Sequence, residues 1–93
     1  MVTLPSILTH DLAAKFAVGL KQAVQSEPAE VVVDANALKQ FDSSALAVLL
    51  ECRRQALAAG KSFYVQGAPA RLLELATLYG VAALIPATPA VAA

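Results

Sequence analysis

The sequence is poor in the residues on which most enzymes and metal proteins depend. Its 93 residues include one cysteine, one histidine and no tryptophan. A lone Cys52 cannot form an internal disulfide, and it fits a reducing compartment. His10 and Cys52 lie far apart in the chain, so no nucleophile and base pair is indicated, and no ligand cluster has metal-site spacing. We therefore expect no enzyme activity, no cofactor and no metal.

The chain also lacks an excess of charge, a long apolar run and a glycine-rich loop. Seven lysines and arginines balance seven aspartates and glutamates, so no nucleic-acid partner is indicated. The longest apolar run, residues 45–50, is far shorter than the ~20 residues that cross a bilayer. Pro5, His10 and Asp11 interrupt any signal peptide. The four glycines stand apart, which argues against a phosphate-binding loop. We expect a cytoplasmic protein without membrane insertion.

What is abundant is apolar side chain. Hydrophobic residues make up 58% of the chain and charged residues 15%, a balance that excludes intrinsic disorder. The length predicts a single domain. We place that domain at residues 1–86 and expect residues 87–93, rich in alanine and proline, to form a disordered tail.

The first half of the chain predicts a strand, a helix and a second strand. Residues 2–8 read as an extended segment with a kink at Pro5, which has no N–H to donate. Leu12, Phe16, Leu20 and Val24 are spaced by four and predict one amphipathic helix that begins near Thr9 or Asp11 and ends before Pro28. The run Val31–Val33 predicts a central strand buried on both faces.

The second half repeats this alternation. Residues 35–40 read as a loop, and a helix is predicted from residues 42–44 to Gly60, a residue suited to a left-handed cap. A strand follows at residues 62–66. Pro69 is expected as the first residue of a helix that ends at Gly80, and residues 81–85 as a short final strand. Strands joined by helices predict an α/β fold with a small, mostly parallel sheet.

One segment, Asp42-Ser43-Ser44-Ala45-Leu46, combines a carboxylate and two hydroxyls at a helix start, where backbone N–H groups lack partners. Simple capping explains these residues without any function. Alternatively, the site accepts a phosphate on Ser43 or docks the polar groups of a partner. A phosphate there would lie at the positive end of the helix dipole and would repel Asp42.

This segment, together with the order of elements, resembles the STAS domain family, whose fold is that of the anti-sigma factor antagonist SpoIIAA. Family members place an Asp-Ser/Thr-x-Gly/Ala-Leu stretch at the start of the second helix, after a buried strand. Here the strand is Val31–Asp34 and the stretch begins at Asp42. The resemblance extends from about Leu4 to Pro86. It implies a non-catalytic binding domain.

Two branches of the family are candidates. In sigma-factor antagonists, the serine that matches Ser43 is phosphorylated by an anti-sigma factor kinase, and only the unphosphorylated form binds. The MlaB branch comprises the small cytoplasmic STAS subunits of Mla phospholipid-transport ABC complexes, which bind the ATPase subunit. MlaB-like features of this chain are Leu4-Pro5, Gln66-Gly67, Leu78-Tyr79-Gly80 and Leu84-Ile85-Pro86. The resemblance favours the MlaB branch, with the antagonist as the alternative.

The chain departs from the family at its first strand, which is missing or reduced to the residues before Leu4. Ala45 stands where the family has glycine, and Ser43-Ser44 replaces the Thr-Gly of the MlaB branch. The residues that we expect to bind the partner are Asp42, Ser43, Ser44, Ala45, Arg53 and Arg54. An ordinary solvated helix face is an equal interpretation of the two arginines, and Tyr79 is either an interface aromatic or a core residue.

Overall fold

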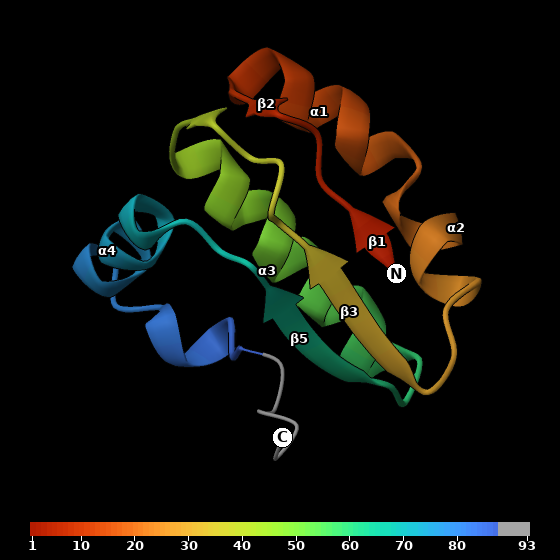
Figure 1. The fold of residues 1–93 in the computed structure, drawn as a ribbon. Coiled ribbons are helices and arrows are strands. Elements are labelled where there is room, and N and C mark those ends of the chain that lie inside the picture. The colour runs from red at the N-terminus through yellow and green to blue at the C-terminus, as the bar shows by residue number, and fades with distance from the viewer. Residues whose placement is uncertain (88–93) are drawn as a thin grey trace.

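The structure, a computed structural model, describes residues 1–87. Strands and helices alternate along the chain and lie side by side in space (Figure 1). In chain order the elements are β1 (Val2–Thr3), β2 (Ile7–Leu8), α1 (His10–Val18), α2 (Leu20–Gln25), β3 (Glu30–Asp34), β4 (Gln40–Phe41), α3 (Ser43–Ala58), β5 (Ser62–Gln66), α4 (Ala70–Leu78) and the 3-10 helix η1 (Ala82–Leu84).

The strands form two parallel sheets. The larger has the order β1-β3-β5, with Val2 opposite Val33 and Val33 opposite Val65. The smaller pairs β2 with β4, so that Leu8 lies opposite Phe41. The parallel α/β architecture and the central position of β3 agree with the predictions from sequence.

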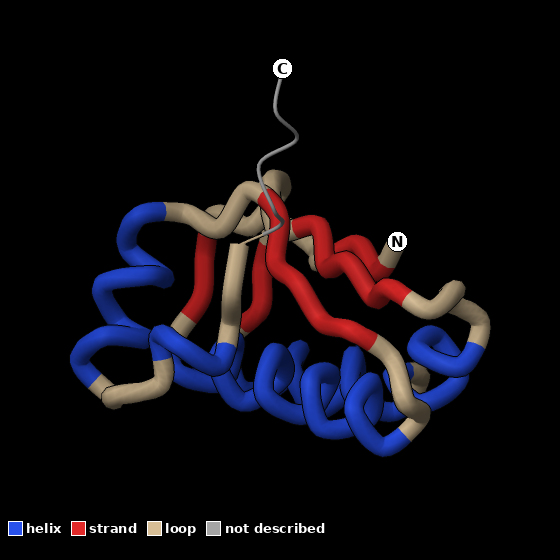
Figure 2. The backbone as a smooth tube through the Cα atoms, turned by 90° about the horizontal axis from the view of Figure 1, so that it is seen from below, coloured by secondary structure: helices blue, strands red, loops and turns tan. Residues whose placement is uncertain are grey.

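The helices gather on one side of the strands (Figure 2). Neighbouring residues of a strand point to opposite faces of the sheet. Accordingly Val31 and Val33 are buried, whereas Val32 and the opposing Tyr64 are half-buried. The prediction that the valine strand is buried on both faces is therefore wrong, because helices cover one face only.

The first strand is reduced, as the sequence predicted, and the N-terminal segment pairs in two places. β1 keeps two residues beside β3, and the amide of Leu4 donates to the carbonyl of Asp34 at 2.9 Å. After Pro5 the chain leaves this sheet and pairs again as β2. Its partner is β4, which begins at Gln40 in the segment that we expected to be a loop. Because β2 lies far from β4 in the sequence, no local sequence pattern predicts that β4 is a strand.

The single helix predicted to begin near Thr9 or Asp11 and to end before Pro28 is two helices, divided at Gly19. Glycine destabilises a helix interior by about 1 kcal/mol relative to alanine. Gly19 has φ −93° and ψ 1°, and no atom lies within 4 Å of the position that a Cβ would occupy. A close neighbour is therefore not the reason for the glycine. Downstream of the break, α2 buries Leu20 and Val24.

Two predictions near the C-terminus are wrong. Pro69 is extended and precedes α4, rather than being its first residue. Residues 81–85 form no strand but contain η1. The pairing with β5 comes later, where the amide of Val65 donates to the carbonyl of Pro86 at 2.8 Å and Ala87 forms a parallel bridge with Val65. Of the expected tail, Ala87 is thus paired, and residues 88–93 lie outside the described residues.

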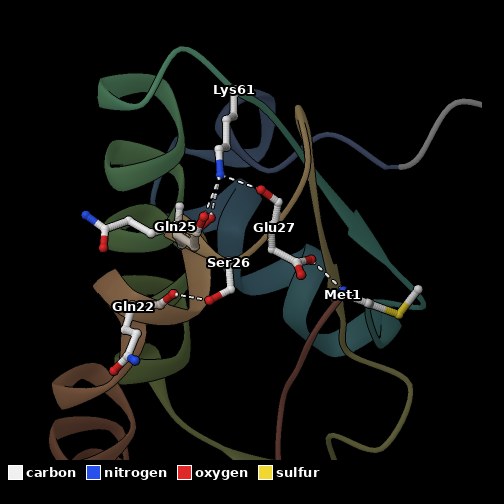
Figure 3. A network of polar contacts seen from close by, with 7 residues as sticks. Met1, Gln22, Gln25, Ser26, Glu27 and Lys61 are labelled. Carbon is white, nitrogen blue, oxygen red and sulfur yellow. Dashed lines mark hydrogen bonds and ion pairs between the residues drawn. The ribbon is translucent and has the colours of Figure 1, made fainter.

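The core lies between the larger sheet and the helices. Its fully buried leucines come from the N-terminal segment and from α2, α3 and α4: Leu4, Leu8, Leu20, Leu49 and Leu72. The C-terminal end of α2 is fixed by the ammonium of Lys61, which donates to backbone carbonyls there (Figure 3). The N-terminal ends of α1 and α3 lie next to each other, because both helices follow the paired strands β2 and β4.

Candidate functional site: the N-terminal half of α3

Asp42 is the N-cap residue of α3, as the sequence predicted. Its Oδ1 accepts a hydrogen bond from the amide of Ser44 at 2.8 Å. Its Oδ2 accepts a second hydrogen bond, at 3.2 Å, from the amide of His10, the first residue of α1. Both carboxylate oxygens are therefore bound to backbone N–H groups of helix starts.

These hydrogen bonds favour the charged form of the carboxylate. The amide and the hydroxyl of Ser44 lower the pKa of Asp42 most, and the amide of His10 adds to this, although partial desolvation opposes it. The carboxylate that caps the helix start is thus ionised at neutral pH.

The three residues after Asp42 differ in exposure. Ser43 is exposed, and within residues 1–87 its hydroxyl makes no hydrogen bond to the protein. Ser44 is half-buried. The side chain of Ala45 is fully buried, with 0% exposure. The expectation that Ala45 contacts a partner is therefore corrected: its methyl group belongs to the core.

An apolar groove runs from Ser43 along α3 toward the end of α4. Its volume is about 330 Å³, and its lining carries no charged residue. Tyr79 forms one wall and is 58% exposed, and the neighbouring Leu78 is 80% exposed. The lining residues, which we call the α3–α4 groove, are Ser43, Leu46, Ala47, Leu50, Tyr79 and Val81.

A second groove lies on the other side of α3, against α1. Its volume is about 230 Å³. Ala47 lines both grooves, so the exposed ridge of α3 stands between two hollows. The lining of this α1–α3 groove consists of His10, Ala13, Ala14, Ala17, Ser44, Ala47, Val48 and Glu51.

The two arginines lie further along α3 and do not line either groove. The guanidinium of Arg54 donates to both carboxylate oxygens of Glu51, with Nε 2.7 Å from Oε1 and Nη2 2.7 Å from Oε2. This ion pair lowers the pKa of Glu51 and raises the pKa of Arg54. Arg53 is half-buried. Arg54 thus has an intramolecular partner, and the arginines do not meet the serines in one site.

Residues 1–86 match the family model described as "Mlab, STAS domain". The chain belongs to the STAS domain family. No curated protein gives a significant match to the sequence. The family match covers the α/β fold and the α3 segment together, and it agrees with the resemblance to the MlaB type that the motifs indicated.

Cys52 and His10 are placed in this STAS domain as the sequence predicted. Cys52 is buried on α3, and desolvation, with smaller contributions from Glu27 and Glu51, raises the pKa of its thiol to about 11. Such a thiol is a poor nucleophile at neutral pH. His10 is exposed at the start of α1, where its backbone amide rather than its imidazole contacts Asp42.

Two other features are absent from residues 1–87, a metal-binding cluster and a membrane-spanning helix. No three or more His, Cys, Asp or Glu side chains are grouped so that they could hold a metal ion. None of the helices in this part of the chain combines the length and the apolarity needed to cross a membrane.

Sequence reasoning found Asp42, Ser43 and Ser44 but missed most of the α3–α4 groove. Leu46 lines the groove but is also a core residue with 3% exposure, and Val81 lies in the segment that was expected to be a strand. Leu50 is half-buried and lines the groove. Tyr79 was the available signal, because aromatic residues are enriched at interfaces, and the structure shows it to be exposed.

Proposed function

We propose that this STAS domain is a non-catalytic subunit that binds and supports the MlaF-like ATPase of an Mla-type ABC phospholipid transporter, which maintains outer-membrane lipid asymmetry. The match to the MlaB type supports this function. In the complex, a permease and lipid-binding subunits accompany the ATPase. The domain lies in the cytoplasm and reaches the inner membrane through the transporter, without inserting into the bilayer.

The observation that carries the proposal is the α3–α4 groove beside Ser43. Its lining is apolar apart from one hydroxyl at its end and the phenol of Tyr79. Interface centres are depleted of charge and enriched in aromatic residues, and a groove of this kind receives apolar side chains of a partner. Ser43 supplies a free hydroxyl for one polar contact at the edge. Asp42 and Ser44 shape that end of α3.

Binding alone explains how such a subunit supports an ATPase. A protein that binds the folded, assembled state of its partner stabilises that state by mass action. The STAS domain therefore needs no reactive group of its own.

The exposed hydroxyl of Ser43 also favours a second candidate function. In it, the domain is an anti-sigma factor antagonist with Ser43 as phosphoacceptor. The hydroxyl is accessible to a kinase and lies at the start of α3. A phosphate would add negative charge next to the carboxylate of Asp42 and would occupy the end of the α3–α4 groove. In this function the partner is a kinase-like anti-sigma factor.

The test is to isolate the tagged chain from native cells and to identify its partners by mass spectrometry, with the Ser43 peptide read in the same run. An ABC ATPase together with unmodified Ser43 supports the transporter subunit. A kinase-like partner with phosphorylated Ser43 contradicts it and supports the antagonist.

Substitutions at Ser43 separate the same two functions with purified proteins. In the antagonist, Ser43→Asp abolishes partner binding and Ser43→Ala leaves it intact. In the transporter subunit, Ser43→Ala removes one interface hydrogen bond and weakens binding of the ATPase by roughly 0.5 to 1.5 kcal/mol.

A further inference from the structure

Two helix starts lie side by side because two short parallel strands precede them. β2 and β4 pair with Leu8 opposite Phe41, and α1 and α3 begin directly afterwards. The carboxyl ends of parallel strands meet at one edge of a sheet, so the unpaired N–H groups of both helix starts converge there.

The first turn of α1 has no side-chain cap from its own N-cap residue, Thr9. The helix has nine residues, below the length at which helices are stable alone in water, and Ala13 is its only buried residue. The first turn closes through the amide of Ala13, which donates to the carbonyl of Thr9 at 2.8 Å.

Asp42 supplies the side-chain hydrogen bond to the start of α1 that Thr9 does not make. One carboxylate oxygen accepts from the amide of Ser44 in α3, and the other accepts from the amide of His10 in α1, which is 32 residues away in the sequence. The negative charge also lies near the positive ends of both helix dipoles. A single side chain therefore caps two helices.

We propose that Asp42 is a positioning residue of the partner surface: it keeps the first turn of α1 formed, and that turn builds the outer wall of the α1–α3 groove. Four residues of α1 line this groove opposite α3, beginning with His10. Each carboxylate oxygen accepts from a backbone amide, one in α1 and one in α3. In this proposal Asp42 acts through these two helices and not by contacting the partner. This inference rests on the proposed function, and it extends the partner surface from the α3–α4 groove across Ala47, which lines both grooves, to the α1–α3 groove.

Asp42→Asn separates the two caps. Asparagine is as good an N-cap residue as aspartate, so its amide oxygen serves Ser44, while its NH2 group cannot accept from His10. Amide hydrogen exchange of the free chain, followed by NMR, reads the two first turns. Ala13 reports on α1, and Ala45, whose amide donates to the carbonyl of Asp42 at 3.0 Å, reports on α3.

We expect Asp42→Asn to increase exchange of Ala13 about tenfold and to leave Ala45 within twofold, as expected for loss of one hydrogen bond to a charged group. Asp11→Asn is the control, because it removes an equal charge from the same turn. The Asp11 side chain makes no hydrogen bond within residues 1–87, and we expect less than a twofold change. Unchanged exchange of Ala13 in Asp42→Asn would overturn the proposal.

A rescue variant tests the link to binding. Adding Thr9→Asp to Asp42→Asn gives α1 its own cap and restores the lost charge. We expect the affinity for the purified ATPase to fall about tenfold in Asp42→Asn. In the double variant the affinity should recover. Recovered exchange without recovered affinity overturns the proposal, because Asp42 would then contact the partner. If the native chain binds no ATPase, the proposed function fails. The exchange result still tests whether Asp42 caps both α1 and α3.

Discussion

At the scale of single residues, Lys61 shows how one side chain can complete a helix far away in the sequence. Its ammonium donates to the carbonyls of Val24 at 2.9 Å, Gln25 at 3.2 Å and Glu27 at 2.5 Å (Figure 3). The last carbonyls of a helix have no intrahelical partner, and a cation there also complements the helix dipole. Lys61, the residue before β5, therefore caps the end of α2.

Replacing Lys61 with methionine should destabilise the fold. The methionine keeps most of the apolar stem but removes the ammonium donor from three carbonyls, of which that of Val24 still accepts from the amide of Glu27 at 3.1 Å. We expect the free energy of unfolding to fall by about 1 to 3 kcal/mol, measured by urea denaturation. Lys21→Met is the matched control, since Lys21 is an exposed lysine of α2 that makes no hydrogen bond within residues 1–87, and a change of less than about 0.5 kcal/mol is expected. Equal effects of the two substitutions would refute the capping role.

At the scale of elements, α1 and α2 divide at Gly19 and α3 ends before Gly60, but of these two positions only Gly60 has a backbone conformation that favours glycine. Gly19 has a negative φ and open space around its Cα, so a side chain fits there. Gly60 has φ +73°, a conformation that side chains disfavour. The same substitution should therefore have opposite effects at the two positions.

Gly19→Ala is expected to stabilise the domain by roughly 0.5 to 1 kcal/mol, because alanine reduces the conformational freedom of the unfolded chain. Gly60→Ala should destabilise it by about 1 kcal/mol, since its φ requires the left-handed region. Thermal and urea unfolding of both variants provide the measurement. A destabilised Gly19→Ala would show that the break between α1 and α2 requires a glycine.

At the scale of the whole molecule, the one-sided sheet leaves α3 as a ridge between two grooves. α1 lies along one side, and the end of α4 with Val81 along the other. Ala47 lies on this ridge and lines both grooves, so it stands at the centre of the surface that we assign to the partner.

Ala47→Glu should therefore prevent binding of the ATPase. A carboxylate at the centre of an apolar interface loses its water without gaining a partner, and we expect affinity to fall on the order of 100-fold or more. Ala58→Glu places the same charge at the other end of α3, where the alanine is also exposed, and should leave affinity within about twofold. Titration calorimetry measures both, and circular dichroism checks the fold. Similar losses in the two variants would place the interface elsewhere on α3.

The sequence by itself determined the alternation of strands and helices, the parallel sheet, the capped start of α3 at Asp42 and the left-handed end at Gly60. These features depend on local patterns: a β-branched run, apolar residues at helical spacing, and cap residues. Only the tertiary structure decided the pairing of β2 with β4, the second hydrogen bond of Asp42 to His10, and the meeting of Ser43 with Tyr79 and Val81. Each of these joins residues distant in the sequence. Which face of a valine strand is covered, and whether an apolar residue ends in the core or beside a groove, depends on how the elements pack.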